Sequence, residues 1–432
     1  MRIVTTADDY GLTRGNTDDI LSAADAGGVN NVSVFANGEA LEYAVAEYAK
    51  RAPALDISLH LNLTEGPALS ARQDVALLVD AAGFFRYSPG QLLLRYVCAL
   101  PKTRRRLREQ AAQEIRAQLE AVSSRLAPHD LSISGVDGHQ HVHMIPFVFD
   151  ALIAQEVRVR IRMPAESLHA YDVHSLFVVA KRLVGWAVLR LFTARNRRCA
   201  SLRGLIGNDY FIGFLFSGRM TLDAVRSGLG SLPTSAQDAG LCEIIFHPGM
   251  TRGGELTRWK QGRCNTAWHT SLWRGREREL LMSGQFRDIL DGRVSAGENL
   301  ISTLLRFGIS GCIAATVDLS VLYIATGIFG IWYLYSAVIA FLCAFMVSFV
   351  LQKLWTFRGK HMHRVERQVP YFFALQASNL AVNTLLMYVF VDWFHLWYLG
   401  TQFFLLATIA IWSFFVMRHV VFAPHREASL RV

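Results

Sequence analysis

The chain has 432 residues and a formal net charge of +9, and 52% of its residues are hydrophobic. Six cysteines without CxxC spacing exclude a disulfide framework and suit a reducing compartment. Much of the basic charge lies beside apolar segments, which favours a membrane surface with acidic headgroups over nucleic acid as the partner.

Two adjacent carboxylates follow the first predicted strand. Residues 2–6 are mostly β-branched or apolar and indicate a short buried strand, after which come Asp8 and Asp9. Like charges held this close raise each other's pKa unless a cation lies between them or one of them carries a proton. The pair therefore indicates a metal or proton-transfer site. The competing interpretation is an N-cap for a helix expected over residues 12–26.

A strand with one polar face comes next. Residues 32–36 predict a second strand and 40–51 a helix, while residues 56–66 alternate between apolar and polar side chains. Ser58, His60 and Asn62 share the polar face of this third strand. His60 is then either a hydrogen-bonded core residue or a ligand, and the strand pattern leaves both open.

The segment 91–125 begins apolar and then becomes strongly basic, at Lys102, Arg104, Arg105, Arg106 and Arg108. This pattern predicts a helix. Its basic residues either face solvent or form a patch toward a membrane surface, where they could pair with lipid phosphate.

Three histidines occur at every second position after an alternating segment, 131–136. If the strand continues, His139, His141 and His143 point to one face with Asp137 beside them. Neutral imidazole is a common metal ligand. The alternative is a solvated histidine-rich turn.

Alternating strands and helices, including a helix over 147–155 and a strand over 158–163, predict an α/β fold with a mainly parallel sheet. Sites in such folds gather at the carboxyl ends of the strands. Acidic, histidine and arginine side chains recur at these ends, and we expect them to meet in one site: Asp8, Asp9, His60, His139, Arg162 and His247.

The segment 174–198 is apolar with interspersed Lys and Arg, and it is too charged to span a bilayer. It predicts either a buried helix or a helix lying in the membrane interface with its arginines reaching the headgroups. We favour the interfacial helix.

The last part of the chain is membrane-like. Residues 319–352 contain no charged side chain, and neither do residues 368–391 or 396–417. These lengths predict four spanning helices, at about 304–327, 331–353, 370–392 and 396–419. Trp and Tyr lie near their ends, as in interfacial belts. Lys353 and Arg358 belong to a basic middle connection, so the positive-inside rule places both termini and the first domain on the cytoplasmic side.

Five motifs in the first part occur together: Ala-Asp-Asp-Tyr-Gly at 7–11, His-Leu-Asn-Leu-Thr-Glu-Gly at 60–66, Asp-Gly-His-Gln-His-Val-His at 137–143, Arg-Met-Pro at 162–164 and Phe-His-Pro-Gly at 246–249. In this order they resemble the YdjC-like carbohydrate deacetylase family. The resemblance implies a deacetylase domain over residues 1–292 with a distorted, barrel-like α/β fold.

The second part resembles the GtrA-like four-helix membrane proteins. The matching segments are Arg-Phe-Gly-Ile-Ser-Gly at 306–311, Asp-Leu at 318–319 and Ser-Phe-Val-Leu-Gln-Lys-Leu-Trp-Thr-Phe at 348–357. This implies a linker at 293–300, a membrane domain over 301–423 and a tail at 424–432. Such proteins are associated with polyprenyl-phosphate-linked sugars. Small residues such as Gly308 and Gly311 could pack against another copy, so a homo-oligomer is one option.

The first resemblance also implies roles for single residues. One divalent metal (Zn, Mg, Mn or Co) would be held by Asp9, His60 and His139. Asp8 would be the general base, His247 an acid or transition-state stabiliser, and Arg162 a contact for acyl or sugar oxygens. This chain has Gly-His-Gln at 138–140 where the family often has Ser-His-His. His141 and His143 therefore stay alternatives to His139.

Together these features predict a membrane-anchored, metal-dependent N-deacetylase or deformylase. Its substrate would be an amino sugar on polyprenyl phosphate, at the cytoplasmic face of a bacterial inner membrane. Arg104, Arg105, Arg106, Lys353 and Arg358 would pair with the phosphate. The alternative is a carrier or flippase for such a lipid, in which the first domain only selects cargo.

Overall fold

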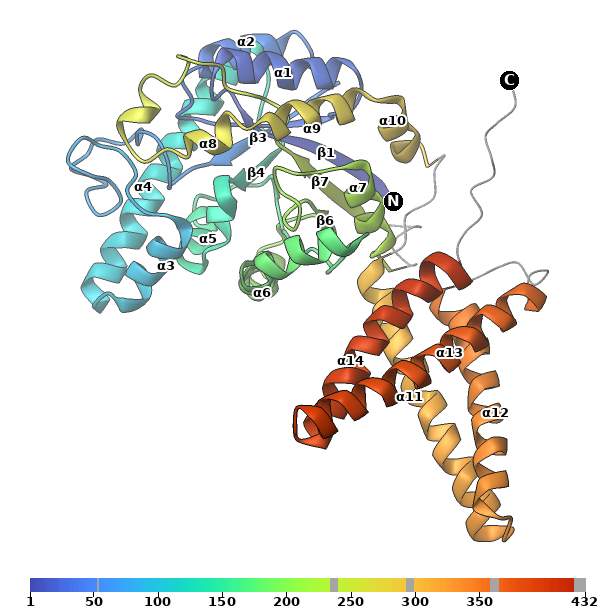
Figure 1. Cartoon of the computed structure of the whole chain (residues 1–432). Coiled ribbons are helices and arrows are strands. Elements are labelled where there is room, and N and C mark those ends of the chain that lie inside the picture. Colours follow the sequence, from blue (N-terminus) through green and yellow to red (C-terminus); the bar gives the residue numbers. More distant parts are fainter. Residues whose placement is uncertain (53, 234–239, 293–298, 358–364, 423–432) are drawn as a thin grey trace, which may run out of the picture. The chain divides into compact units, whose positions relative to one another are not determined.

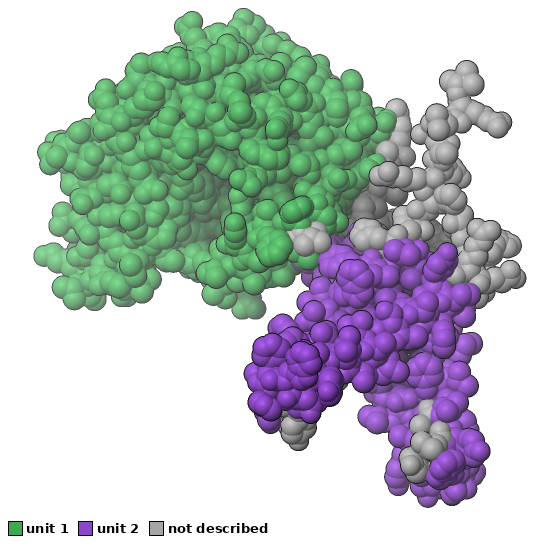
Figure 2. Space-filling model, viewed as in Figure 1, with its two compact units in different colours: residues 1–299 green, residues 300–432 purple. Residues whose placement is uncertain are grey.

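The computed structural model describes residues 1–432 apart from 53, 234–239, 293–298, 358–364 and 423–432 (Figure 1). It contains two compact units, residues 1–299 and residues 300–432, which Figure 2 colours separately. Arg358, most of the linker expected at 293–300 and the tail expected at 424–432 lie outside the described residues.

A parallel sheet of seven strands forms the centre of the first unit, in the order β5-β4-β3-β2-β1-β7-β6. The strands are β1 (Arg2–Tyr10), β2 (Asn31–Val34), β3 (Asp56–Leu61), β4 (Gly135–Gly138), β5 (Arg160–Ile161), β6 (Tyr210–Ile212) and β7 (Leu241–Phe246). Single parallel bridges join Ile161 to Gly207 and Glu166 to Phe211, so the two edges of the sheet curl toward each other. The predicted α/β, barrel-like fold with a parallel sheet is confirmed.

Helices surround this sheet (Figure 1). They are α1 (Arg14–Asp25), α2 (Leu41–Ala49), α3 (Pro89–Cys98), α4 (Pro101–Leu126), α5 (Pro146–Ile153), α6 (Val173–Ser201), α7 (Leu222–Gly230), α8 (Thr266–His269), α9 (Leu272–Met282) and α10 (Gly284–Leu290). The N-cap of α1 is Thr13, whose side chain accepts a hydrogen bond from the N–H of Asn16. The acidic pair Asp8 and Asp9 is therefore not the cap of this helix, and another role is left for it.

The histidine segment differs from the prediction. β4 ends at Gly138, and residues His139–Met144 form 3-10 turns (η2) instead of continuing the strand. Gln140 and His141 have φ values of 51° and 54°, in the left-handed region. This reversal rotates successive side chains in different directions, so the expected common face of His139, His141 and His143 does not form.

The second unit is a bundle of long helices. They are α11 (Leu300–Tyr323), α12 (Tyr333–Leu351), α13 (Val365–Tyr388) and α14 (Tyr398–Val416), each followed by a π-helical turn. Of the described segments, Leu300–Ile328, Val338–Thr356 and Gln368–Trp393 are long and apolar enough to cross a membrane, while the apolar stretch Phe404–Val416 is shorter. Three of the four predicted spans thus meet this standard in the part of the chain that the structure describes.

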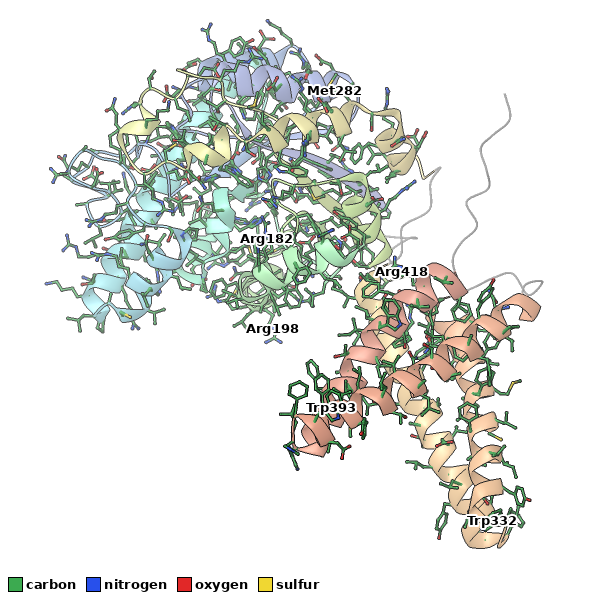
Figure 3. The ribbon with its side chains drawn as sticks, in the orientation of Figure 1. Arg182, Arg198, Met282, Trp332, Trp393 and Arg418 are labelled. Carbon is green, nitrogen blue, oxygen red and sulfur yellow. The ribbon has the colours of Figure 1, made fainter. Side chains whose placement is uncertain are left out.

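Aromatic and basic side chains mark opposite ends of this bundle. Trp332 lies at the tip of the α11–α12 hairpin and Trp393 at the tip of the α13–α14 hairpin, whereas Arg418 lies at the other end (Figure 3). The bundle core packs Phe349 and Phe372 against Met417. Indole rings at one end are typical of a helix pair that reaches a membrane–water interface.

Candidate active site

Asp9, His60 and His139 converge at the carboxyl end of the sheet. They come from the end of β1, from β3 and from the residue after β4. Oδ1 of Asp9 lies 3.4 Å from Nε2 of His60 and 3.3 Å from Nδ1 of His139. The three side chains are buried, and one ligand atom from each lies within 4.8 Å of the others. Two imidazoles and a carboxylate leave coordination positions open, as a catalytic metal requires.

Two of these ligand atoms lack ordinary partners. Oδ1 of Asp9 and Nε2 of His60 are buried and accept or donate no hydrogen bond within the described residues. A buried polar atom without a partner costs about 1–3 kcal/mol, and more for a charged group. The donor set and these unpaired atoms fit a divalent cation.

The backbone at the end of β1 separates the two adjacent carboxylates. Asp9 has a φ of 68°, and the pairing of β1 with β2 is irregular between Ala7 and Tyr10. A left-handed, non-glycine residue costs roughly 1–2 kcal/mol. This strained turn directs Asp9 toward the two histidines, while Asp8 faces a guanidinium.

His60 is oriented by a second carboxylate. Its Nδ1 atom lies 2.6 Å from Oδ1 of Asp137, and the hydroxyl of Ser33 donates to both oxygens of Asp137 at 2.6 Å. Burial alone would raise the pKa of Asp137, but Arg162 and His60 hold it below its ordinary value. An ionised Asp137 accepts the Nδ1 proton, which leaves Nε2 as the ring nitrogen that faces Asp9.

Asp8 is held by a two-pronged ion pair. Nη1 and Nη2 of Arg162 donate to its Oδ2 and Oδ1 at 2.9 and 2.8 Å. Burial raises the pKa of Asp8 to about 6, against the opposing effect of Arg162. A fixed carboxylate with a raised pKa suits a general base.

Arg162 has no exposed face toward a substrate. Its Nε donates to Glu243 at 3.0 Å, and its Nη2 lies 3.0 Å from Oδ2 of Asp137 in addition to its bonds to Asp8. The side chain is 1% exposed. This geometry does not support the expected contact with acyl or sugar oxygens, because the guanidinium is enclosed by three carboxylates. The contacts of Arg162 in this structure are with Asp8, Asp137 and Glu243.

His247 follows β7 and completes the site. Its Nε2 lies 3.9 Å from Oδ2 of Asp8, and its ring meets Trp268 edge to face at 5.0 Å between centroids. Its backbone N–H donates to Glu277 at 2.6 Å. Burial lowers the pKa of His247 well below 6.5, so the imidazole is neutral. A neutral imidazole can donate a hydrogen bond to a developing oxyanion.

His141 and His143 are not part of the ligand cluster, although His141 belongs to the lining of the cavity that opens onto it. The ring of His141 packs against Phe211 and Phe214, with centroids 5.7 Å apart in each case. Nε2 of His143 lies 3.0 Å from the carbonyl oxygen of Arg162. Of the three histidines, His139 is the one beside Asp9 and His60.

Three further side chains belong to the site but were not predicted from the sequence. Nη2 of Arg274, from α9, donates to Oδ2 of Asp9 at 2.7 Å. Glu65 lies 3.8 Å from Nε2 of His139 through its Oε1, and its Oε2 lies 3.1 Å from Nε2 of His269. Arg274 and His269 follow no strand, so strand-end reasoning could not find them. Glu65 stands inside a quoted motif, and its charge was the available clue.

A cavity of about 420 Å³ opens onto these groups. Its lining includes Asp8, His139, His141, His247 and Trp268, together with Arg182. Arg182 comes from α6 and donates to the carbonyl oxygens of Phe214 and Ser217. In Figure 3 it lies inside the unit, whereas Arg198 of the same helix lies at the outer edge.

The predicted phosphate-binding residues fall in two places. Arg104, Arg105 and Arg106 are on α4, where Arg105 and Arg106 are exposed and Arg104 donates to the carbonyl oxygen of Val97. Lys353 is buried in the π-helical turn after α12, and its Nζ has no hydrogen-bond partner in the described part of the chain.

Comparisons with known proteins agree with this architecture. Residues 2–292 match the family model of YdjC-like proteins, and residues 306–422 match the GtrA/DPMS transmembrane domain. A carbohydrate deacetylase of Mus musculus is 35% identical over 58% of this chain and 78% of its own length. One of Oceanobacillus iheyensis is 34% identical over 40% of this chain and 68% of its own. A chitooligosaccharide deacetylase of Yersinia enterocolitica is 33% identical over 34% of this chain and 52% of its own.

Proposed function

Because the chain belongs to the YdjC-like protein family and carries a GtrA/DPMS transmembrane domain, we propose that it is a membrane-bound, metal-dependent carbohydrate deacetylase. It removes the N-acyl group of an amino sugar. The names of its relatives support the reaction class, since they are carbohydrate and chitooligosaccharide deacetylases. A deformylase would use the same chemistry.

One observation carries the proposal. Three buried ligand-type side chains, two of them with unpaired ligand atoms, stand beside a tethered carboxylate with a raised pKa. A divalent cation held by Asp9, His60 and His139 would polarise the amide carbonyl and lower the pKa of water. A simple carbohydrate-binding site needs neither feature.

The roles of the other side chains follow from their positions. Asp8 takes a proton from the water that adds to the amide carbon, and Arg162 keeps its carboxylate in place. The neutral His247 donates its ring N–H to the developing oxyanion. The C–N bond breaks when the proton reaches the amine nitrogen, which yields a carboxylate and a free amino sugar.

The substrate is an amino sugar attached to a polyprenyl phosphate. The helices of the second unit support a lipid environment, and the GtrA/DPMS match supports a polyprenyl-linked sugar. Lys353 is buried at the end of the bundle and its Nζ has no hydrogen-bond partner within the described residues, so Lys353 is assigned to the lipid phosphate. Confinement to one membrane presents the substrate at high effective concentration.

The basic ends of the bundle support a cytoplasmic active site in a bacterial inner membrane. Arg306, Lys353 and Arg418 belong to the ends of helices opposite the hairpin tips, and the stretches 324–332 and 389–397 contain no Lys or Arg. Under the positive-inside rule this end faces the cytoplasm.

The test is mass spectrometry of a polyprenyl-phosphate N-acetylhexosamine after incubation with the purified full chain. We expect loss of one acetyl mass, abolished by EDTA and by Asp8→Asn. A matched control is Asp18→Asn, at an exposed position of α1, which should leave the reaction unchanged. Full activity in EDTA, or in the Asp8 variant, would refute the assigned chemistry. Transport of an intact lipid without loss of the acyl group would favour the carrier alternative.

A further inference from the structure

The outer face of α6 is apolar and exposed. Phe177, Val184 and Leu191 are seven residues apart and 65%, 78% and 69% exposed, and Val188 lies between the last two. Side chains with this spacing occupy one face of a helix. Together they form an apolar stripe over four turns of α6.

The charge of the same helix is entirely positive. Residues 173–208 contain no Asp or Glu, and their basic residues are Lys181, Arg182, Arg190, Arg195, Arg197, Arg198 and Arg203. Lys181 and Arg198 are exposed beside the stripe. Arg182 and Arg190 donate to backbone carbonyl oxygens, whereas Arg195 pairs with Asp150 at 2.7 Å.

A second apolar and basic surface lies at the turn from α3 to α4. Leu94, Val97 and Leu100 are exposed there, directly before the basic run at the start of α4. α5 packs against both α4 and α6, and both α3 and α6 pack against η2, the segment that carries His139. Figure 1 shows α3 and α6 along the same edge of the unit.

We propose that the stripe of α6 and the α3–α4 turn form one docking surface for an anionic lipid bilayer. Apolar side chains would enter the headgroup boundary, and the basic ones would contact lipid phosphate. The bilayer is the occupant that matches both the apolar stripe and the absence of acidic residues. The chain is also held at a membrane by its second unit.

The surface has a consequence for the active site. The inner side of α6 carries Arg182 into the wall of the active-site cavity, while its outer side carries the stripe. Docking through α6 therefore places the active-site cavity one helix away from the headgroup layer. This part of the inference rests on the proposed function, because only a lipid-linked substrate needs that position.

The experiment labels α6 in the full chain. In a background with Ser at the five cysteines other than buried Cys242, Val184→Cys carries an environment-sensitive fluorophore, and Ala46→Cys on α2 is the matched exposed control. The protein is reconstituted in phosphatidylcholine vesicles with or without phosphatidylglycerol. We expect quenching by spin-labelled lipid at position 184 but not at 46, and about twofold more of it with the anionic lipid.

Other outcomes would overturn the proposal. A blue shift without lipid quenching would mean that protein covers the stripe, either the second unit or another copy of the chain. Emission like that of the Ala46 control would mean that α6 faces water. Equal quenching in both vesicles would remove the role of the anionic headgroup.

A second readout separates docking from function. The double substitution Val184→Glu and Leu191→Glu should lower activity on a lipid-linked N-acetyl sugar about tenfold and leave activity on a soluble N-acetylated sugar unchanged. An equal loss on both substrates would indicate misfolding and overturn the positioning role. If the unmodified chain deacylates neither substrate, the proposed function fails while the quenching result still decides the docking.

Discussion

Nδ1 of His60 lies 2.6 Å from Oδ1 of Asp137. The carboxylate of Asp137 also accepts a hydrogen bond from the hydroxyl of Ser33 and forms an ion pair with Arg162. We predict that Asp137→Asn lowers the affinity for the divalent metal roughly 10- to 100-fold, because the imidazole loses the acceptor that fixes its tautomer. Calorimetric titration of the metal-free protein measures this. Ser33→Ala, which removes only a donor to Asp137, should have a smaller effect. Unchanged affinity in the Asp137 variant would contradict the orienting role.

Asp8→Asn should leave metal binding intact and lower kcat roughly 100- to 10,000-fold, since it removes the proton acceptor but not a ligand. Metal content by mass spectrometry and steady-state rates check the two halves. Arg162→Lys should give an intermediate loss in kcat, because one ammonium cannot hold both oxygens of Asp8. Loss of metal in the Asp8 variant would show that Asp8, and not Asp9, is the metal ligand.

Glu277 makes stability depend on pH. Burial raises its pKa to about 7, although the N–H groups of His247 and Met220 donate to it and oppose the shift. The folded state therefore favours the protonated form of Glu277. The contribution of this group to the unfolding free energy is fully present below pH 4.5 and is lost as the pH rises through about 7.

Between pH 5 and pH 8, the unfolding free energy of the native chain should fall by roughly 2–3 kcal/mol relative to Glu277→Gln. Any effect of the Gln side chain itself on the unfolding free energy of the variant is the same at both pH values. Comparing the change from about pH 5 to about pH 8 in the two proteins therefore cancels that effect. Denaturant unfolding of both proteins at each pH measures it. Parallel stability curves would argue against the raised pKa.

Lys353→Met should raise KM for the lipid-linked substrate about tenfold and leave kcat/KM for a soluble N-acetylated sugar unchanged, since the ammonium contacts only the lipid phosphate in our assignment. Arg14→Gln removes an exposed charge from α1, away from the proposed docking surface, and is the control for net charge. An equal effect on both substrates would mean that Lys353 supports the fold of the bundle and not the ligand.

Gly66 allows the turn that holds Glu65. Its φ is +71°, and a Cβ atom there would lie 2.5 Å from the indole of Trp259. Gly66→Ala should destabilise the fold by about 2–4 kcal/mol, from backbone strain and overpacking together. Gly83 has a φ of +86° but open space, so Gly83→Ala should cost only about 1 kcal/mol. Thermal unfolding compares the two variants, and equal losses would remove the packing argument.

The sequence predicted the sheet well because parallel strands are buried on both faces and read as apolar runs. β1 and β3 were located in this way, and their polar ends identified Asp9 and His60. The same reasoning failed after Gly138. Alternation alone does not reveal that Gln140 and His141 adopt left-handed backbone, so three histidines appeared to share one face.

Other parts of the site depend on contacts between residues far apart in the chain, which a local sequence pattern does not predict. Arg274 reaches Asp9 across 265 positions, and Arg162 is enclosed by carboxylates from three strands. β6 and α7 were not predicted either, because their short segments carry weak periodicity. The second unit was easier, since uncharged runs of bilayer length are visible in the composition itself.

The pairing of β1 with β2 is irregular at its end, and the positions of Asp8 and Asp9 depend on the register of this strand. Asp8 and Asp9 are neighbours in the chain, yet one is tied to a guanidinium and the other to two imidazoles. A shift of β1 by a single residue would move one carboxylate into the place of the other and bring Ala7 or Tyr10 into the place that it leaves. Deleting or inserting one residue in β1 would thus inactivate the enzyme even where the barrel still forms, and this strand should tolerate changes of side chain far better than changes of length.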